Sequence, residues 1–366
     1  MALSTRARRV LADPLAQRSV EVLKAGQAAS GAFVASPSFP TYRYAWLRDG
    51  AFCAHGLELV GEHAAASAWH AWVARSIGAH RGLIESAVAR VGNGETPPPE
   101  AMPPARYTLD GGLEHADEEP WPNFQVDGYG MWLWALEEHV GRERLPEELA
   151  ATVELVARYL AATWRLRCFS CWEELDGGEH ASTLGAVYAG LAAAARLLER
   201  EEHQACADDV SAALLERFVE DGRFKRGPDD PRLDGSLLWL AVPFGVLPPG
   251  DPRIAATVAQ VARDLTGPEG GVYRYLGDTY YGGGEWLLLT CSLGWHAASV
   301  GDDDAYGSAR RWAQAQALEN GELPEQVTDF AQDPEMVEPW VRRWGPVATP
   351  LLWSHAMYLL MESAAD

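Results

Sequence analysis

Positive charge, cysteine and long apolar runs are all scarce in this sequence of 366 residues. Acidic side chains outnumber basic ones by 52 to 30, so the formal net charge is −22. The electric field of such a chain repels nucleic acid and anionic lipid, and we therefore expect neither nucleic acid nor a membrane as a partner. This field does not disfavour neutral ligands.

The sequence also lacks an obvious targeting or anchoring segment. Residues 1–12 carry three arginines, but no apolar stretch typical of a signal peptide follows, and we identify no run long enough to span a bilayer. Five cysteines are a sparse and odd set, which is typical of a reducing compartment rather than of a disulfide framework. These features predict a cytoplasmic protein.

Metal ligands at useful spacing are few as well. Cys168 and Cys171 have the CxxC spacing, but a zinc site normally needs a second pair or nearby histidines, and none stands at suitable spacing. We therefore predict that these two residues are ordinary buried thiols and that no metal is bound.

Alternating strand patterns are nearly absent, whereas helical periodicity recurs along the chain. Asp13-Pro14 is a clear helix start, because an N-cap residue precedes a proline at the first helical position. The periodic segments predict an all-α fold with about twelve helices in a single domain over residues 1–366. We expect these helices at 14–26, 51–59, 63–77, around 132–136, and at 146–164, 182–198, 203–218, 235–246, 251–265, 286–300, 302–317 and 350–361.

The helical pattern stops in residues 92–124, which contain Pro97-Pro98-Pro99, Pro103-Pro104 and Gly111-Gly112. A loop of this length inside a compact domain is usually either disordered or functional. Its mixture of Trp, Tyr, Arg and acidic residues favours function. We predict that residues 92–124 form the rim of a binding site.

Aromatic and charged residues gather at the junctions that precede every second helix. These junctions are Trp46–Asp49, Trp121–Asp127, Trp172–Glu174, Leu233-Asp234, Arg274–Trp286 and the segment around Glu325. In a closed ring of alternating outer and inner helices, all inner helices run in one direction, so their starts meet at one end. The pattern predicts an (α/α)6 toroid with one shared pocket. A plain helical array would explain the Asp residues as caps, but not the Trp and Tyr residues beside them.

Two glutamates in these junctions can perform acid–base chemistry. Glu173 follows an indole at a loop-to-helix junction, where an apolar neighbour can keep a carboxylic acid protonated, and Glu325 lies in a proline-marked turn. Hydrolysis of a glycosidic bond needs one acid for the departing oxygen and one carboxylate that attacks or activates water. A structural role at the start of a helix is a poor explanation for Glu173. For Glu174, this structural role and a role in the site are equally good explanations.

These junctions resemble the motifs of glycoside hydrolase family 15, the glucoamylases and their relatives. The segment Tyr42–Asp49 is similar to the first motif of that family, Trp121–Gly128 to the second, and Trp172-Glu173-Glu174 to the motif of the general acid. The segment Arg274–Trp286 resembles the fourth motif, and Glu325-Gln326 resembles the motif of the base. The resemblance extends from about residue 31 to about residue 355.

The resemblance implies an inverting, exo-acting α-glucosidase on an (α/α)6 barrel, which uses no metal and no cofactor. It makes Glu173 the general acid and Glu325 the base that activates water. The implied substrate-binding residues are Tyr42, which steadies the base, the Arg48–Asp49 pair and Arg274 at the terminal glucose, Glu174 at the next sugar unit, and Trp46, Trp121, Trp172, Tyr280 and Trp286 as walls of the pocket.

Departures from the family pattern shape the expected substrate. Gly282–Glu285 replaces an Asn- and Pro-containing turn, so we expect Glu285 to bring a carboxylate near the sugar beyond the terminal glucose. Few residues flank the helical region, which argues against raw starch. We predict a small oligosaccharide as the partner, with α-1,6-linked isomaltose ahead of α-1,4-linked maltose. One alternative is trehalose hydrolysis. The other is a sugar-sensing barrel without turnover, and the presence of both carboxylates disfavours this second alternative.

Overall fold

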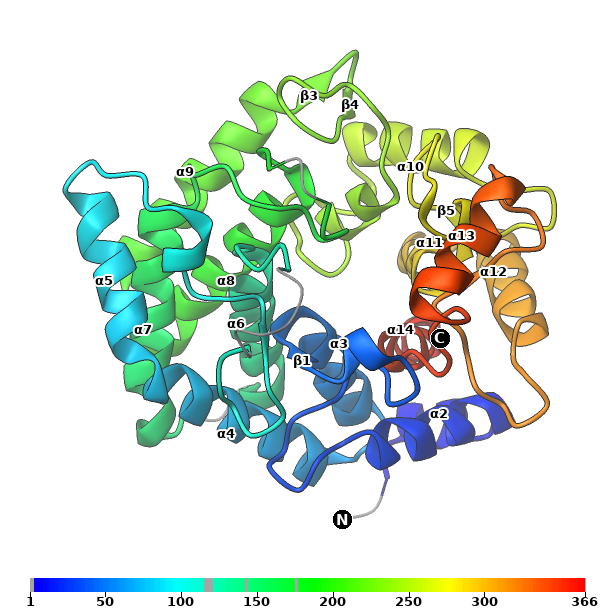
Figure 1. The fold of residues 1–366 in the computed structure, drawn as a ribbon, viewed down its shortest axis with the longest axis horizontal. Coiled ribbons are helices and arrows are strands. Elements are labelled where there is room, and N and C mark those ends of the chain that lie inside the picture. Colours follow the sequence, from blue (N-terminus) through cyan, green and yellow to red (C-terminus); the bar gives the residue numbers. More distant parts are fainter. Residues whose placement is uncertain (1–2, 115–120, 142–143, 175–176, 366) are drawn as a thin grey trace.

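The computed structural model shows a closed ring of alternating inner and outer helices (Figure 1) and describes residues 3–114, 121–141, 144–174 and 177–365. The inner ring consists of α3 (Leu47–Leu59), α6 (Asp127–Val140), α8 (Ala181–Leu198), the 3-10 helix η3 (Gly235–Leu240), α11 (Leu287–Val300) and α14 (Leu352–Ala364). Each of these elements packs on the next, and α14 returns to α3. The predicted (α/α)6 toroid is therefore confirmed.

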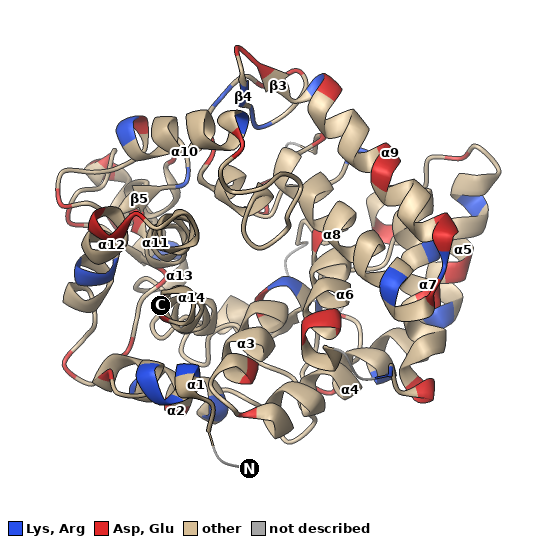
Figure 2. Cartoon of the chain, turned by 180° about the vertical axis from the view of Figure 1, so that it is seen from behind, with Lys and Arg blue, Asp and Glu red and all other residues tan. Residues whose placement is uncertain are grey.

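The outer ring consists of α2 (Pro14–Ala25), α4 (His63–Ala79), α7 (Glu147–Thr163), α9 (Glu201–Arg217), α10 (Pro252–Asp264) and α12 (Asp303–Ala315). Several of these helices start where the sequence predicts, because the Asp13, Asp251 and Asp302 side chains accept hydrogen bonds from backbone N–H groups of the first turn. In Figure 2 charged residues lie mainly on outer helices, whereas α11 and α14 are almost free of them.

The inner helices are buried on nearly all sides, and α8, with 18 residues, is the longest of them. A Cβ atom added to Gly130 of α6 would lie 2.2 Å from the Ala186 oxygen of α8, so only glycine permits this close approach. By length and composition α8 could cross a membrane, which corrects our expectation that no run is long enough. However, 78% of this segment is buried inside the ring, as befits a core helix.

Aromatic rings fill the centre of the inner ring. Phe52 stacks on Trp353 with ring centroids 5.4 Å apart, and Trp239 lies 5.5 Å from Trp353 and 6.2 Å from Phe52. Trp134 packs on Phe52 from the other side at 5.6 Å. All four side chains are buried, so the ring is a packed core rather than a channel.

Some elements differ from the prediction. The expected helix 235–246 is shortened to η3, because Pro243 cannot donate a backbone hydrogen bond and Gly245 has a positive φ of 61°. Three short helices were not predicted: α1 (Thr5–Val10), α5 (Arg81–Gly92) and α13 (Val337–Trp344). In addition, α3 starts at Leu47, four residues earlier than expected, which places Arg48 and Asp49 in its first turn.

Two-residue strands and short 3-10 helices shape the loops. The strands are β1 (Ala45–Trp46), β2 (Arg106–Tyr107), β3 (Val219–Glu220), β4 (Arg223–Phe224), β5 (Val272–Tyr273), β6 (Glu285–Trp286) and β7 (Gln326–Val327), and the 3-10 helices are η1 (Pro40–Tyr42), η2 (Pro99–Ala101), η4 (Tyr280–Gly282) and η5 (Pro334–Met336). Strand β1 pairs with β2, β3 with β4, and β6 lies between β5 and β7, all antiparallel. Because β1 and β6 run directly into α3 and α11, these pairs fix the entrance to two inner helices.

The ring is closed by polar contacts to one carboxylate at the start of α2. Asp13 Oδ2 accepts hydrogen bonds from Arg310 Nη2 at 2.7 Å, from Gln314 Nε2 at 2.9 Å and from Tyr358 Oη at 2.6 Å. The three donors belong to α12 and α14. Hydrogen bonds to a charged group are stronger than neutral ones, so Asp13 joins the first hairpin to the last.

Candidate active site

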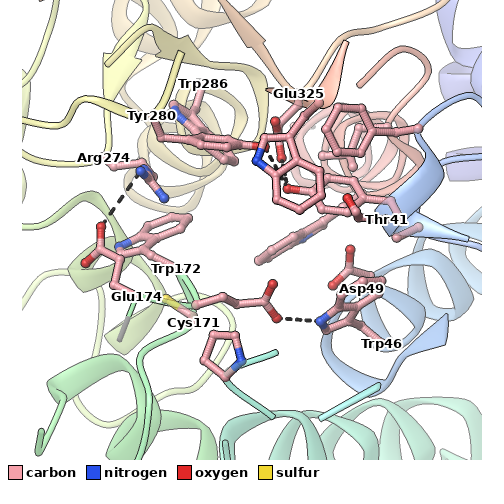
Figure 3. Close-up of a pocket in the computed structure, with 18 of the residues that line it drawn as sticks. Thr41, Trp46, Asp49, Cys171, Trp172, Glu174, Arg274, Tyr280, Trp286 and Glu325 are labelled. Atoms are coloured by element: carbon pink, nitrogen blue, oxygen red, sulfur yellow. Dashed lines mark hydrogen bonds and ion pairs between the residues drawn. The ribbon is translucent and has the colours of Figure 1, made fainter. Parts of the chain in front are cut away.

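A cavity of about 420 Å³ opens where the inner helices begin. It is lined from several junctions at once, since Arg48 of α3, Trp286 before α11 and Trp353 of α14 all reach it. The aromatic core beneath Trp353 closes its floor. Figure 3 shows the arrangement, with Glu325 and Tyr280 on one side of the pocket, Trp46 and Asp49 across from them, and Glu174 and Arg274 on a third side.

The carboxylate of Glu173 lies in the loop before α8 and is surrounded by donors. Trp46 Nε1 donates to Oε1 at 2.5 Å and Trp121 Nε1 to Oε2 at 2.9 Å. Arg48 Nη2 and Gln125 Nε2 lie 3.2 and 3.1 Å from Oε1. Glu173 itself has a φ of 63°, which is unusual for a residue with a Cβ atom and indicates that the surroundings fix its direction.

Arg48 links the starts of two inner helices. Its Nη1 donates to Gln125 Oε1 at 2.7 Å and to Asp127 Oδ2 of α6 at 3.1 Å. Asp49 lies beside it, with Arg48 Nε 3.7 Å from Oδ2. Burial raises the pKa of Asp49 to about 7, against the attraction of Arg48. Asp49 Oδ2 and Arg48 Nε are buried and have no hydrogen-bond partner among the described residues, although both side chains line the pocket.

Glu325 faces the pocket from the segment just before β7 and is only 3% exposed. Tyr42 Oη donates to Glu325 Oε1 at 3.0 Å and lies 3.0 Å from Tyr280 Oη. Burial raises the pKa of Glu325 to about 7, although the Tyr42 hydrogen bond and Arg274 act in the opposite direction. Within the described part of the chain Glu325 Oε2 has no hydrogen-bond partner. Burial thus raises the pKa of this carboxyl group toward neutrality, and one of its oxygens has no protein donor among the described residues.

We expect the Tyr42→Phe enzyme to lose activity at a higher pH than the wild type. The hydrogen bond from Tyr42 lowers the pKa of Glu325, so its removal raises that pKa. Activity that needs the ionised carboxylate is present above the pKa and is lost as the pH falls through it. Because hydrogen bonds to charged groups contribute about 1.5–3 kcal/mol, kcat/KM at pH 6 should fall roughly 10-fold or more.

Tyr280→Phe is the matched control for this pH prediction. Tyr280 contacts Tyr42 through its hydroxyl group, so its replacement should move the acid limb of the kcat/KM profile in the same direction but less. An acid limb that stays in place in the Tyr42→Phe enzyme would contradict the coupling of Tyr42 to Glu325.

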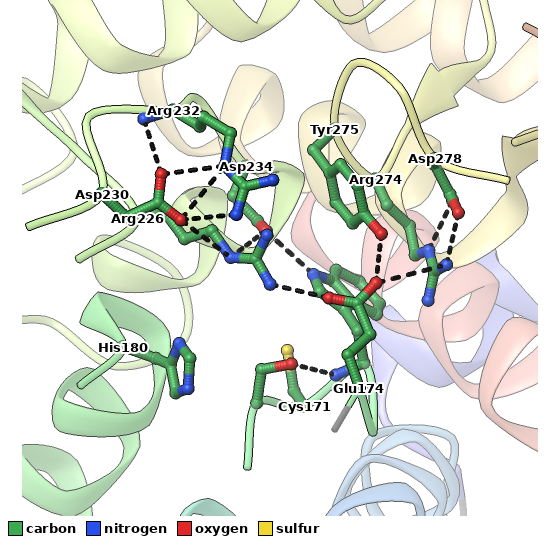
Figure 4. Close-up of polar contacts among 12 residues, drawn as sticks. Cys171, Glu174, His180, Arg226, Asp230, Arg232, Asp234, Arg274, Tyr275 and Asp278 are labelled. Atoms are coloured by element: carbon green, nitrogen blue, oxygen red, sulfur yellow. Dashed lines mark hydrogen bonds and ion pairs between the residues drawn. The ribbon is translucent and has the colours of Figure 1, made fainter. Parts of the chain in front are cut away.

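Glu174, next to Glu173, points into a network of charged residues (Figure 4). Arg226 Nη2 donates to its Oε2 at 2.8 Å, and the Tyr275 hydroxyl group donates to Oε1. Arg274 lies 3.8 Å from Oε1 and is itself held by Asp278, with Nε–Oδ2 and Nη2–Oδ1 distances of 2.7 and 2.6 Å. Glu174 is thus fixed at the wall of the pocket that it shares with Arg274.

Indole rings form the remaining walls. Trp172 lies 5.5 Å from Trp286, and its Nε1 donates to both oxygens of Asp234. The Trp286 and Trp353 Nε1 atoms are buried and have no partner in the described residues. Flat apolar faces beside unused donors and carboxylates suit a neutral polyhydroxy ligand, which presents C–H faces and hydroxyl groups together.

The structure brings all twelve predicted site residues to this pocket: Tyr42, Trp46, Arg48, Asp49, Trp121, Trp172, Glu173, Glu174, Arg274, Tyr280, Trp286 and Glu325. Of the predicted rim 92–124, Trp121 and Pro122 line the pocket, while residues 115–120 lie outside the described residues. Asp278 and Asp234 act as structural hydrogen-bond partners, and the thiols of Cys168 and Cys171 are buried and free.

Sequence reasoning missed part of the wall. Trp340, Arg343 and Trp344 line the pocket from α13, and Gln125 contacts Glu173 directly. The signal for α13 was its two tryptophans within five residues. The segment is too short, at eight residues, to show a clear helical period.

The expectation for Glu285 was wrong. Successive residues of a strand point to opposite sides, so with Trp286 facing the pocket Glu285 points away from it. Its side chain fills the space beside Gly267, where an added Cβ atom would meet Glu285 Oε1 at 2.0 Å. Burial raises the pKa of Glu285 to about 7, and Oε1 has no hydrogen-bond partner among the described residues.

We expect Glu285→Gln to stabilise the protein at alkaline pH without changing activity. The folded state holds the proton of Glu285 more tightly than the unfolded chain, so the wild type loses stability as the pH rises from about 4.3 to above 7. The neutral amide avoids this cost, on the order of 2 kcal/mol at pH 8. Thermal melting should show a higher Tm at pH 8 and no gain at pH 4.5. An equal gain at both pH values would contradict the titration of Glu285.

Residues 12–315 match the sequence profile of the glycosyl hydrolases family 15. The chain belongs to this family and is a glycoside hydrolase. It is 42% identical to the isomaltose glucohydrolase of Kribbella flavida over 355 residues, which cover 95% of this chain and 91% of the relative. A trehalase of Mycobacterium tuberculosis is more distant, at 29% identity over 288 residues that cover 74% of this chain and 42% of that protein.

Solved structures place the family 15 fold over the whole chain. A wild-type glycosidase that is 39% identical superposes with a TM-score of 0.91 over 99% of both chains. A Glu-to-Ala variant of a glycosidase in complex with glucose, also 39% identical, superposes with a TM-score of 0.91 over 100% of both chains. The likeness therefore includes the loops that form the pocket.

Proposed function

We propose that this family 15 enzyme is an inverting exo-α-glucosidase that releases β-glucose from small α-glucosides, with isomaltose preferred over maltose. The observation that carries the substrate is the 42% identity, over nearly the full length of both chains, to a protein named isomaltose glucohydrolase. The closed floor of the pocket supports exo action, because only a chain end can enter. We extend the proposal to a cytoplasmic location, which the buried free thiols support.

In the proposed reaction Glu173 and Glu325 act from opposite sides of the terminal glucose. The acid of Glu173 gives its proton to the glycosidic oxygen as the C1–O bond breaks, and Glu325 takes a proton from the water whose oxygen bonds to C1. The water adds from the face opposite the leaving group, which inverts the anomeric centre. Glu325 lies across the pocket from Trp46, the indole that holds Glu173, in support of this assignment (Figure 3).

The other residues bind and orient the sugar. Arg48, Asp49 and Arg274, which line the pocket, would bind hydroxyl groups of the terminal glucose. Glu174 would accept a hydroxyl group of the second sugar unit. The indoles of Trp172 and Trp286 would pack on the ring faces of this second sugar unit. None of these steps requires a metal or a cofactor.

Trehalose is the second candidate substrate, because two trehalases are related to the chain at 29% and 28% identity. Each match covers 42% of the trehalase, whereas the match to the isomaltose glucohydrolase covers 91% of that protein. A sugar-sensing barrel is disfavoured, since both carboxyl groups are present and face one pocket.

Proton NMR of the enzyme mixed separately with isomaltose, maltose and trehalose tests the proposal. We expect the anomeric signal of β-glucose to appear first, and fastest from isomaltose. Early α-glucose would contradict inversion. Faster turnover of trehalose would make trehalose, rather than isomaltose, the preferred substrate. Calorimetric binding of glucose without hydrolysis of any substrate would favour the sensing barrel.

A further inference from the structure

We propose that Arg106 is a positioning residue for the general acid, because its guanidinium group holds the two indoles whose N–H groups bind Glu173. The proposal rests on the function proposed above for Glu173. Arg106 belongs to β2, is 2% exposed and is absent from the lining of the pocket. It therefore acts on the reaction only through other side chains.

The guanidinium group lies between three aromatic rings. Arg106 Cζ is 4.1 Å from the ring centroid of Trp121, 5.2 Å from that of Trp46 and 4.3 Å from that of Tyr44. The register of β1 and β2 pairs Arg106 with Trp46, so the backbone fixes this placement. Trp46 and Trp121 then donate to the two different oxygens of Glu173. One cation thus sets the direction of both donors.

Hydrogen bonds hold Arg106 itself in place. Its Nη1 donates to the Thr41 oxygen at 3.1 Å, and its Nη2 forms an ion pair with Glu114. Glu114 also accepts from Asn123 Nδ2, while Ala105 N donates to the Asn123 oxygen at 2.8 Å. The part of the rim that follows Trp121 is therefore tied to the strand that carries Arg106.

Trp121 depends on these contacts because it lies outside any helix or strand. Ala35, Tyr44, Trp46 and Ala105 form a small apolar cluster, against which Tyr42 and Trp121 pack, and this cluster is separate from the main core. An apolar side chain in place of Arg106 could fill the space. Only a flat cation, however, draws electron density from both rings and so strengthens their N–H groups as donors.

The test compares isomaltose with α-glucosyl fluoride, whose fluoride leaves with little help from an acid. In Arg106→Met we expect kcat for isomaltose to fall roughly 10- to 100-fold, below the 10²–10⁴ of full general acid catalysis. The rate with α-glucosyl fluoride should change by less than about 3-fold, because the base is untouched. The loss should fall on kcat rather than on KM, because Arg106 does not line the pocket. Arg106→Lys should lie between Met and wild type, because ammonium cannot stack on two indoles.

Two further variants keep the proposal falsifiable if Arg106→Met does not fold. Glu114→Gln weakens the anchor of Arg106 and should show the same substrate split to a smaller degree. Arg310→Met removes another ion-paired arginine, far from the pocket. It should lower the Tm but leave unchanged the ratio of the rates with isomaltose and α-glucosyl fluoride. Equal losses with both substrates, or a loss confined to KM in the Arg106 and Glu114 variants, would overturn the proposal. Full activity of Glu173→Gln would instead overturn the proposed role of Glu173.

Discussion

Glu173→Gln should reduce kcat for isomaltose by roughly 10²–10⁴-fold while leaving most of the activity with α-glucosyl fluoride. The amide cannot supply a proton to a sugar oxygen, but fluoride leaves without one. The side chain keeps its size, and its oxygen can still accept hydrogen bonds from Trp46 and Arg48. The direct measurement is the ratio of initial rates with the two substrates.

The matched control for this substitution is Glu174→Gln, one residue along the chain. Glu174 is bound to Arg226 and Tyr275 at another wall of the pocket, so its loss should raise KM for isomaltose more than it lowers kcat. Equal loss of the rates with isomaltose and α-glucosyl fluoride in Glu173→Gln would contradict its assignment as the acid. So would a Glu174→Gln enzyme that keeps its rate only with α-glucosyl fluoride.

Glu325→Gln should strongly reduce the hydrolysis of both substrates and to a similar degree. Water must be activated whichever group leaves, so an excellent leaving group offers no rescue, and the loss should reach roughly 10²–10⁴-fold with isomaltose and α-glucosyl fluoride alike. Burial makes the charged form of Glu325 unfavourable, so the neutral amide should not lower the Tm. A Glu325→Gln protein that still cleaves the fluoride well would exclude Glu325 as the base.

The pH dependence of kcat/KM gives a second view of the same group. With a pKa of about 7, Glu325 is increasingly ionised as the pH rises through neutrality. The acid limb of the wild-type profile should therefore lie well above the value of an ordinary glutamate, about 4.3. Asp49 titrates in the same range and faces the same pocket, so the limb should be steeper than that of a single group.

The ring and most of the pocket could be predicted because their signals are local. Inner helices such as α8 are apolar on all sides, and the junctions before them carry residues with no role in a helix cap. Trp46, Trp172 and Trp286 therefore marked one end of the ring without any knowledge of contacts. The motifs around Glu173 and Glu325 supplied the rest.

The misses have two physical causes: tertiary contacts decide where a side chain points, and some local features are too short to show a period. Glu285 was expected in the pocket, although the pleat of β6 turns it away. Pro243 shortens the predicted helix 235–246, and the eight residues of α13 are too few to show a period. Nothing in the sequence distinguishes Arg106 from other arginines, because its aromatic neighbours come from β1 and from Trp121.

The contact of Asp13 with α12 and α14 also sets an order of events during synthesis. Tyr358, one of its partners, emerges from the ribosome long after Asp13, roughly 20–70 s later at 5–20 residues per second. Until then α2 lacks α14, the helix on which it packs most extensively. The ring cannot close before α14 has been made, so we expect its closure to be a late step of folding.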